Sequence, residues 1–336
     1  MKIRSFLASS VLFLLVCLLS CSKDFNSNAE YKDVTVVYGI LNVDDETHYL
    51  KIYRGFLTND DASVAAQCYD SIYYFDKIDV EMEEYVNGRK THTWQLDTTT
   101  QIPVDAGDFS YPKQVLYKFT QPLNPDAEYL LRITNKETGR VVTARTDVVG
   151  SFMVDPHMAR YQNLVNAGTT AFNFYSAPNA YSYDIFQVFY YIERDKVTHE
   201  EVVKKIRRRL TSFPVTGNTL NYYPSALFDR IAAEVQPNPN VDRYISVDSC
   251  LQYEVWAYNE HLHKYVESSS STHSVVMDRL VYSNIESEDG NALGILGARA
   301  YATSWHGLNN PSQEELVRGY RTYNLGFHYA WEYLEL

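Results

Sequence analysis

The stretch from Ile78 to Leu96, which reads IDVEMEEYV-NG-RKTHTWQL, carries the clearest structural signal in the chain. Asn87-Gly88 lies between two strand-like runs and favours a type I′ hairpin turn, because both residues tolerate positive φ. On the first arm, apolar residues at 78, 80 and 82 alternate with acidic residues at 79, 81 and 83. Such alternation is typical of a strand with one buried and one solvated face. The stretch therefore predicts part of an antiparallel sheet.

A second hairpin follows, with arms over 129–134 and 140–146. Tyr129 enters the first arm directly after a turn at Asn124-Pro125-Asp126. This arrangement resembles the tyrosine corner of immunoglobulin-like and fibronectin type III sandwiches, in which the Tyr hydroxyl bonds back to the preceding turn. With further strand-like runs on its N-terminal side, it predicts an immunoglobulin/fibronectin-III-like antiparallel sandwich over residues 31–148.

The length of 336 residues accommodates two domains, and we expect residues 149–336 to form a second β-rich domain with a short helical insertion. Helix patterns lie near 198–211, 225–235 and 312–319. The first pattern begins with a capping box between Thr198 and Glu201. It continues as an apolar stripe at helical spacing, formed by Val203, Ile206 and Leu210. The predicted fold is therefore mainly β.

The N-terminus has the features of a lipoprotein signal. Cations at positions 2 and 4 precede an apolar run over 6–19, which is too short to span a bilayer comfortably. The run ends in Leu18-Leu19-Ser20-Cys21, which resembles the lipobox that signal peptidase II recognises. We expect a signal peptide over 1–20 and a polar tether over 21–30. Diacylglycerol on the Cys21 thiol, with N-acyl chains such as palmitate on its amine, would anchor the chain in a lipid bilayer.

The charge of the chain excludes one class of partner. The formal net charge is −12, and it becomes −14 when residues 1–20, with two cations and no acid, are removed. Nucleic-acid affinity rests on clustered cations, so we expect no nucleic acid as a partner. Cys68 and Cys250 remain after cleavage and lipidation, and the sequence leaves open whether they form a disulfide or stay thiols.

Motifs for catalysis, cofactors and metals are missing from the sequence. His199-Glu200 begins like the H-E-x-x-H zinc helix, but Val203 stands where the second His is required. G-x-S-x-G and the P-loop pattern do not occur. Acidic loops at 44–46, 60–61 and 286–289 lack the ligand spacing of a calcium loop, and calcium binding there stays open. We expect a non-enzymatic protein without a cofactor or a bound metal.

Tyrosine is unusually abundant, with 29 residues, and it points to binding. Neighbouring aromatics in a strand face opposite sides, so a Tyr-Tyr pair sends one ring outward unless both faces are covered. Exposed Tyr and Trp stack on sugars or anchor protein interfaces. The cationic run over 204–209 is a second candidate, for docking on an acidic partner or on lipid headgroups. The predicted binding residues are Tyr190, Tyr222, Tyr223, Trp331, Lys204, Lys205 and Arg208.

Three features together resemble a family of Bacteroidota lipoproteins of unknown function. They are the lipobox, the run Val36–Asn42, and Asn284-Ile285 followed by the run Gly290–Gly297. The resemblance implies an immunoglobulin-like domain, a second β-rich domain, and genes near those of TonB-dependent outer-membrane transporters. It also implies a lipid-anchored location at the outer membrane, on the cell surface or the periplasmic face. The implied role is non-enzymatic binding or assistance to a transporter barrel. Two alternatives stay open, a fimbrial or adhesin-type subunit and a surface glycan-binding lipoprotein that uses exposed Tyr and Trp.

Overall fold

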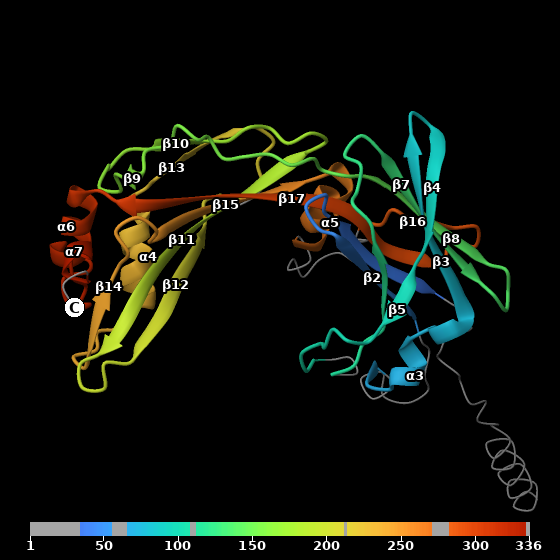
Figure 1. Ribbon diagram of the computed structural model, residues 1–336, viewed down its shortest axis with the longest axis horizontal. Coiled ribbons are helices and arrows are strands. Elements are labelled where there is room, and N and C mark those ends of the chain that lie inside the picture. The colour runs from blue at the N-terminus through green and yellow to red at the C-terminus, as the bar shows by residue number, and fades with distance from the viewer. Residues whose placement is uncertain (1–33, 56–65, 108–111, 212–213, 271–281, 334–336) are drawn as a thin grey trace, which may run out of the picture.

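The computed structural model describes residues 34–55, 66–107, 112–211, 214–270 and 282–333. They form an arch of two lobes, and strand β17 (Ala292–Leu308) runs along its top from one lobe into the other (Figure 1). The chain is mainly β with few helices, which confirms the predicted fold class. The predicted signal peptide and tether, residues 1–30, lie outside the described residues.

The first lobe is a sandwich of two sheets. One sheet contains, in spatial order, β1 (Thr35–Leu41), β2 (Thr47–Arg54), β6 (Leu116–Thr120) and β5 (Asp97–Thr99). The other contains, in spatial order, β16 (Ile285–Ser287), β8 (Val141–Asp147), β7 (Glu128–Asn135), β3 (Ile78–Val86) and β4 (Arg89–Gln95). Ahead of β3 lie the short helix α3 (Tyr69–Ile72) and the 3-10 helix η1 (Phe75–Lys77). The sheets bury a shared apolar core that includes Val37, Met82 and Leu131.

The β3–β4 hairpin forms at the predicted place. Its turn residues Asn87 and Gly88 have φ angles of 50° and 74°. Met82 on the first arm is fully buried, as the alternation predicts. Glu83, predicted on the solvated face, is buried as well. Its carboxylate accepts a hydrogen bond from Arg132 at 3.3 Å, so a neighbouring strand covers the charge and compensates it.

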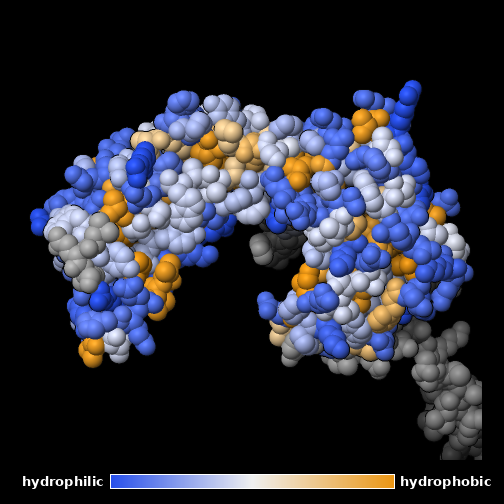
Figure 2. All heavy atoms as spheres, viewed as in Figure 1, coloured by the Kyte–Doolittle hydropathy of each residue, from blue (hydrophilic) through white to orange (hydrophobic). Residues whose placement is uncertain are grey.

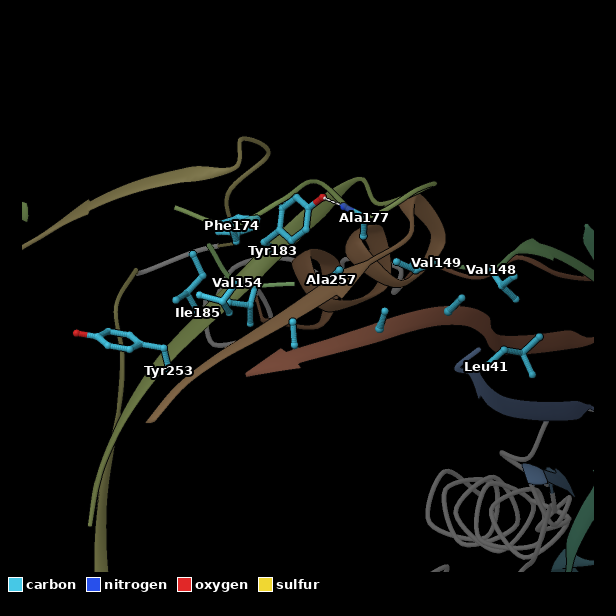
Figure 3. Packing of buried hydrophobic residues seen from close by; sticks show 14 of the residues in the cluster. Leu41, Val148, Val149, Val154, Phe174, Ala177, Tyr183, Ile185, Tyr253 and Ala257 are labelled. Atoms are coloured by element: carbon cyan, nitrogen blue, oxygen red, sulfur yellow. Dashed lines mark hydrogen bonds between the residues drawn. The ribbon is translucent and has the colours of Figure 1, made fainter. Parts of the chain in front are cut away.

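A tyrosine corner is present in each lobe. In the first lobe the backbone N–H of Asn124 donates to Tyr129 Oη at 2.7 Å, which confirms the predicted corner. The same hydroxyl donates to the buried Glu84 carboxylate at 3.0 Å. In the second lobe the Ala177 N–H donates to Tyr183 Oη at 2.9 Å (Figure 3), a corner that the sequence reading did not predict. Both lobes therefore anchor a strand to its preceding turn in the same way.

The second lobe is built around one main sheet. Its strands are, in spatial order, β12 (Glu201–Arg209), β11 (Ser182–Asp195), β15 (Leu251–Tyr258) and the second half of β17. Two short strands extend it, β14 (Val241–Tyr244) beside β11 and β9 (Tyr161–Gln162) beside β17. A separate two-stranded sheet contains β10 (Thr170–Asn173) and β13 (Thr219–Tyr222). The helices are α4 (Ala226–Glu234), α5 (Glu260–Ser270), α6 (Asn310–Arg318) and α7 (Ala330–Tyr333).

Strand β17 joins one sheet of the first lobe to the main sheet of the second lobe, so that both belong to a single ten-stranded sheet. Residues 292–298 pair in parallel with β1, and residues 299–306 pair antiparallel with β15. β16 also returns to the first lobe, where it pairs with β8. The structure therefore differs from the predicted division at residue 148, because strand residues between 285 and 298 complete the first sandwich. The parallel pairing covers an edge of β1 that would otherwise be open to other chains.

Two of the three predicted helices are confirmed, 225–235 as α4 and 312–319 as α6. The helix predicted over 198–211 is wrong, because this segment forms β12, antiparallel to β11. Ile206 is 3% exposed and Val203 is 68% exposed, although a helix would place both on one stripe. Tertiary pairing with the long strand β11 overrides the local helix signal.

A hydrogen-bonded junction around Asn259 joins the lobes. Asn259 is fully buried between β15 and α5, and its side-chain nitrogen donates to Thr146 Oγ1 at 2.7 Å. The same nitrogen donates to the carbonyl and the carboxylate of Asp147, both at 3.0 Å. Its side-chain oxygen accepts from the backbone N–H groups of Leu262 and Ala298, both at 3.1 Å. The apolar core continues past this junction, through Leu41, Val148, Val149, Val154 and Phe174 (Figure 3).

Candidate binding face

One side of the main sheet in the second lobe is exposed to solvent. In β17, the alanines at 298, 300 and 302 are buried, whereas Arg299, Thr303 and Trp305 alternate with them and are exposed. The buried side packs on β10, where Phe172 stacks on Tyr253 at 4.9 Å between ring centroids. We call the exposed side, which carries Trp305, the open face. Figure 2 shows the hollow between the two lobes, with hydrophobic residues along its walls.

A groove of about 490 Å³ lies on the open face. It is lined by Tyr190, Tyr191, Ile192, Val203, Ser246, Ser249, Cys250 and Trp305. The ring centroids of Tyr190 and Trp305 are 5.1 Å apart, with ring planes tilted by 38°, and Trp305 is 46% exposed. The Tyr190 hydroxyl donates to Gln252 Oε1 at 2.9 Å, and burial raises its pKa, so it remains a neutral donor. The groove thus presents two aromatic rings to a ligand, and contacts with neighbouring side chains fix the position of the Tyr190 ring.

A second aromatic pair extends this surface along β15 and β17. The rings of Trp256 and Tyr301 lie 4.6 Å apart, and the Arg299 guanidinium stacks over Trp256 at 4.7 Å. The Trp256 indole N–H has no hydrogen-bond partner among the described residues. Because Arg299 and both rings lie on the same side of the sheet as Trp305, the open face combines aromatic area with positive charge.

Strand β12 adds cations to the open face. Its residues 203, 205, 207 and 209 pair with residues of β11 that share the side of Tyr190. The guanidinium of Arg207 forms an ion pair with Glu254 at 2.9 Å, and that of Arg209 pairs with Asp184 at 2.5 Å. Lys205 is exposed, and within the described ranges it forms no ion pair. This end of the face therefore carries a cation available to a partner.

The structure places the predicted aromatic binding residues in different environments. Tyr190 lies in the groove. Tyr222, predicted as a surface residue, is buried, and its hydroxyl bonds to another Tyr hydroxyl in the core. Tyr223 and Trp331 are exposed outside the groove, with Trp331 on α7. Trp305, which completes the groove, was not predicted, although the alternation of small and large residues over 298–305 is a signal of a half-exposed strand.

The predicted cationic residues lie on both sides of β12, not on one helical face. Lys205 is on the open face, whereas Lys204 and Arg208 point to the opposite side. Arg208 Nε donates to Gln187 Oε1 at 2.7 Å, and its guanidinium also reaches two backbone carbonyls ahead of α4. Lys204 Nζ is 4.0 Å from a Glu193 carboxylate oxygen. Arg208 therefore joins β12 to the segment before α4, and Lys205 alone of the three faces the open side.

Cys68 and Cys250, the two cysteines in the part of the chain that the structure describes, are free thiols. Cys68 is exposed, and Cys250 is fully buried among the residues that line the groove. Burial raises the pKa of the Cys250 thiol to about 12. Since only the thiolate is a strong nucleophile, Cys250 acts as an apolar packing group.

The predicted lipobox, Leu18, Leu19, Ser20 and Cys21, lies outside the described residues. None of the helices that the structure describes combines the length and the apolar character needed to cross a membrane. Across the same ranges, no three His, Cys, Asp or Glu side chains gather as a metal site would require. No model of a known protein family and no curated protein matches the chain, so the family resemblance stays a prediction.

Proposed function

We propose that this chain is a non-catalytic binding protein, held at the outer membrane by lipid on Cys21. It binds a partner protein through the open face of its second lobe, and that partner is a TonB-dependent transporter barrel. The observation that carries the proposal is the groove on the main sheet that is lined by the partly exposed ring of Tyr190 and the exposed ring of Trp305.

The aromatic rings of the open face have the properties of interface anchors. Tyr and Trp are enriched among the residues that dominate binding energy, because they desolvate a large area with few rotatable bonds. Tyr190 is already held by its hydrogen bond to Gln252, and Trp256 is packed between Tyr301 and Arg299. A partner therefore meets side chains that lose little conformational entropy on binding. An apolar side chain of that partner would fill the groove.

The test is purification of the acylated protein from its own membranes in a mild detergent, with mass spectrometry of the proteins that co-elute. We expect a stoichiometric barrel with the wild type and its loss with Trp305→Ala, because truncation of a central Trp weakens an interface by about 30-fold or more. Trp331→Ala removes a similarly exposed Trp from α7 and should retain the barrel. A wild-type protein without a partner contradicts the proposal. Co-eluting copies of this chain, or pilin-like chains, support the fimbrial alternative instead.

Glycan binding is the second candidate function. Sugars stack their apolar faces on aromatic rings and hydrogen-bond through their hydroxyls. The groove offers both, because the ring of Trp305 lies in the same lining as the hydroxyls of Ser246 and Ser249. Titration of the purified protein with oligosaccharides, followed by tryptophan fluorescence, tests this role. Saturable quenching that Trp305→Phe retains and Trp305→Ala loses would support it, and a flat titration would reject it.

A further inference from the structure

Strand β12 leaves one edge of the long sheet open. It is the terminal strand of the sheet order, and no described strand pairs with its outer side. Within the β11–β12 ladder, the N–H of Leu210 donates to the carbonyl of Ile185 at 2.8 Å. Hydrogen-bonded positions alternate along an antiparallel pair, so even-numbered residues of β12 direct their backbone groups to β11. Residues 203, 205, 207 and 209 direct theirs outward.

A cationic cleft lies beside this edge, between β12 and α4. Its volume is about 490 Å³, and its polar lining consists of Arg207, Arg208, Arg209, Arg230 and Asp229. Asp229 Oδ1 forms an ion pair with Arg321 at 3.1 Å, and Arg230 forms one with Glu234 on the same helix. A guanidinium has five N–H donors, so an arginine with one carboxylate partner still has donors for another. In a chain whose overall charge is strongly negative, this cleft is suited to acidic groups.

We propose that an extended acidic segment of a partner protein adds to the sheet as a new strand beside β12. Its backbone pairs with the outward groups of residues 203–209, and its acidic side chains contact Lys205 and the arginines of the cleft. Cations on an edge strand repel the same edge of a second copy, so the charges disfavour a β12–β12 dimer and favour an acidic strand. This inference goes beyond the proposed function, because it uses the sheet edge and not the aromatic groove.

The probe is a fluorescein-labelled peptide of about seven residues, a usual strand length, in which Glu and Val alternate. Its binding to the full-length acylated protein in detergent is measured by fluorescence anisotropy. We expect saturable binding that weakens as salt is added, and no binding of the matched Lys–Val peptide. Tyr49→Ala removes an exposed aromatic side chain from β2 in the first lobe, away from β12, and this control should bind the Glu–Val peptide as the wild type does.

The decisive pair of variants is Lys205→Pro and Lys205→Ala. Proline removes an outward N–H and is tolerated on the solvent side of an edge strand. Lys205→Pro should therefore weaken peptide binding by about tenfold, and Lys205→Ala, which keeps the N–H, by about threefold. Equal affinity of Lys205→Pro and the wild type overturns the proposal.

Amide hydrogen exchange on the wild type gives an answer even where Lys205→Pro does not fold. Bound peptide should slow exchange at residues 203, 205, 207 and 209, because their N–H groups gain partners. Unchanged exchange at these positions overturns the proposal. Binding to phosphatidylglycerol vesicles without binding of the peptide also overturns the proposal. That result would mean that Lys205 and the arginines of the cleft bind lipid headgroups. If the peptide does not bind, the co-purification experiment with Trp305→Ala can still succeed. The strand-addition proposal and the transporter proposal can therefore be refuted independently.

Discussion

Replacement of Asn259 by alanine tests the junction that joins the two lobes. The buried side chain takes part in five hydrogen bonds of 3.1 Å or less, which connect the end of β8, the start of α5 and the middle of β17. Its oxygen accepts from the N–H of Leu262 in the first turn of α5, as a helix N-cap does. It also accepts from the N–H of Ala298 inside the sheet. Alanine removes all of these contacts at once.

The cost follows from two of the lost contacts. Removal of a helix N-cap costs about 1 kcal/mol. A buried backbone N–H without a partner, here that of Ala298, costs about 1–3 kcal/mol more. We therefore expect Asn259→Ala to lower the free energy of unfolding by about 2–4 kcal/mol, which is a large fraction of the usual stability of a domain.

Urea unfolding, followed by tryptophan fluorescence and by circular dichroism, measures this change. Asn166→Ala is the matched control, because Asn166 is exposed and, among the described residues, its side chain accepts only a local hydrogen bond from the Gly168 N–H. The control should change the free energy of unfolding by less than about 0.5 kcal/mol. A loss for Asn259→Ala no larger than that of the control would refute the role given to the junction.

Two further predictions concern β12 and the cysteines. Ile206→Asp should lower the free energy of unfolding by more than about 3 kcal/mol, because it buries a carboxylate, whereas Val203→Asp should change it by less than about 0.5 kcal/mol. Equal effects in urea unfolding would contradict the strand and favour a helical stripe. With a thiol reagent at about pH 8, the native acylated protein should show one fast thiol, Cys68, while Cys250 reacts only after denaturation. A second fast thiol in the native protein would mean that Cys250 is accessible or that Cys21 carries no lipid.

Features determined by neighbouring residues were predictable from the sequence. The turn at Asn87-Gly88 and the corner at Tyr129 depend on a few adjacent positions, and both are confirmed. The helices α4 and α6 were predicted from apolar spacing over one or two turns. The segment after Thr198 shows the limit of such reasoning, because its capping box and apolar stripe are real local signals. The segment nevertheless folds as the nine-residue strand β12, because the strand forms a full ladder of backbone hydrogen bonds with β11.

The candidate site required the tertiary structure. Tyr190 was a candidate from its Tyr-Tyr pair, but its partner Trp305 lies more than a hundred residues later, on a strand that pairs in register with β15. The burial of Tyr222 could not be predicted from its local Tyr-Tyr pattern either, because it depends on packing against Tyr253 of the main sheet.

The sequence by itself determined that the chain is mainly β and where its tight turns, its corner and two of its helices form. Local sterics and alternation act over a few residues, so they can be read directly. Only the tertiary structure decided that β17 pairs with both β1 and β15, which turns two sandwich-like lobes into one arch. Strands this far apart along the chain pair only if their edges pair better with each other than with the other available strand edges. No short stretch of sequence contains that information.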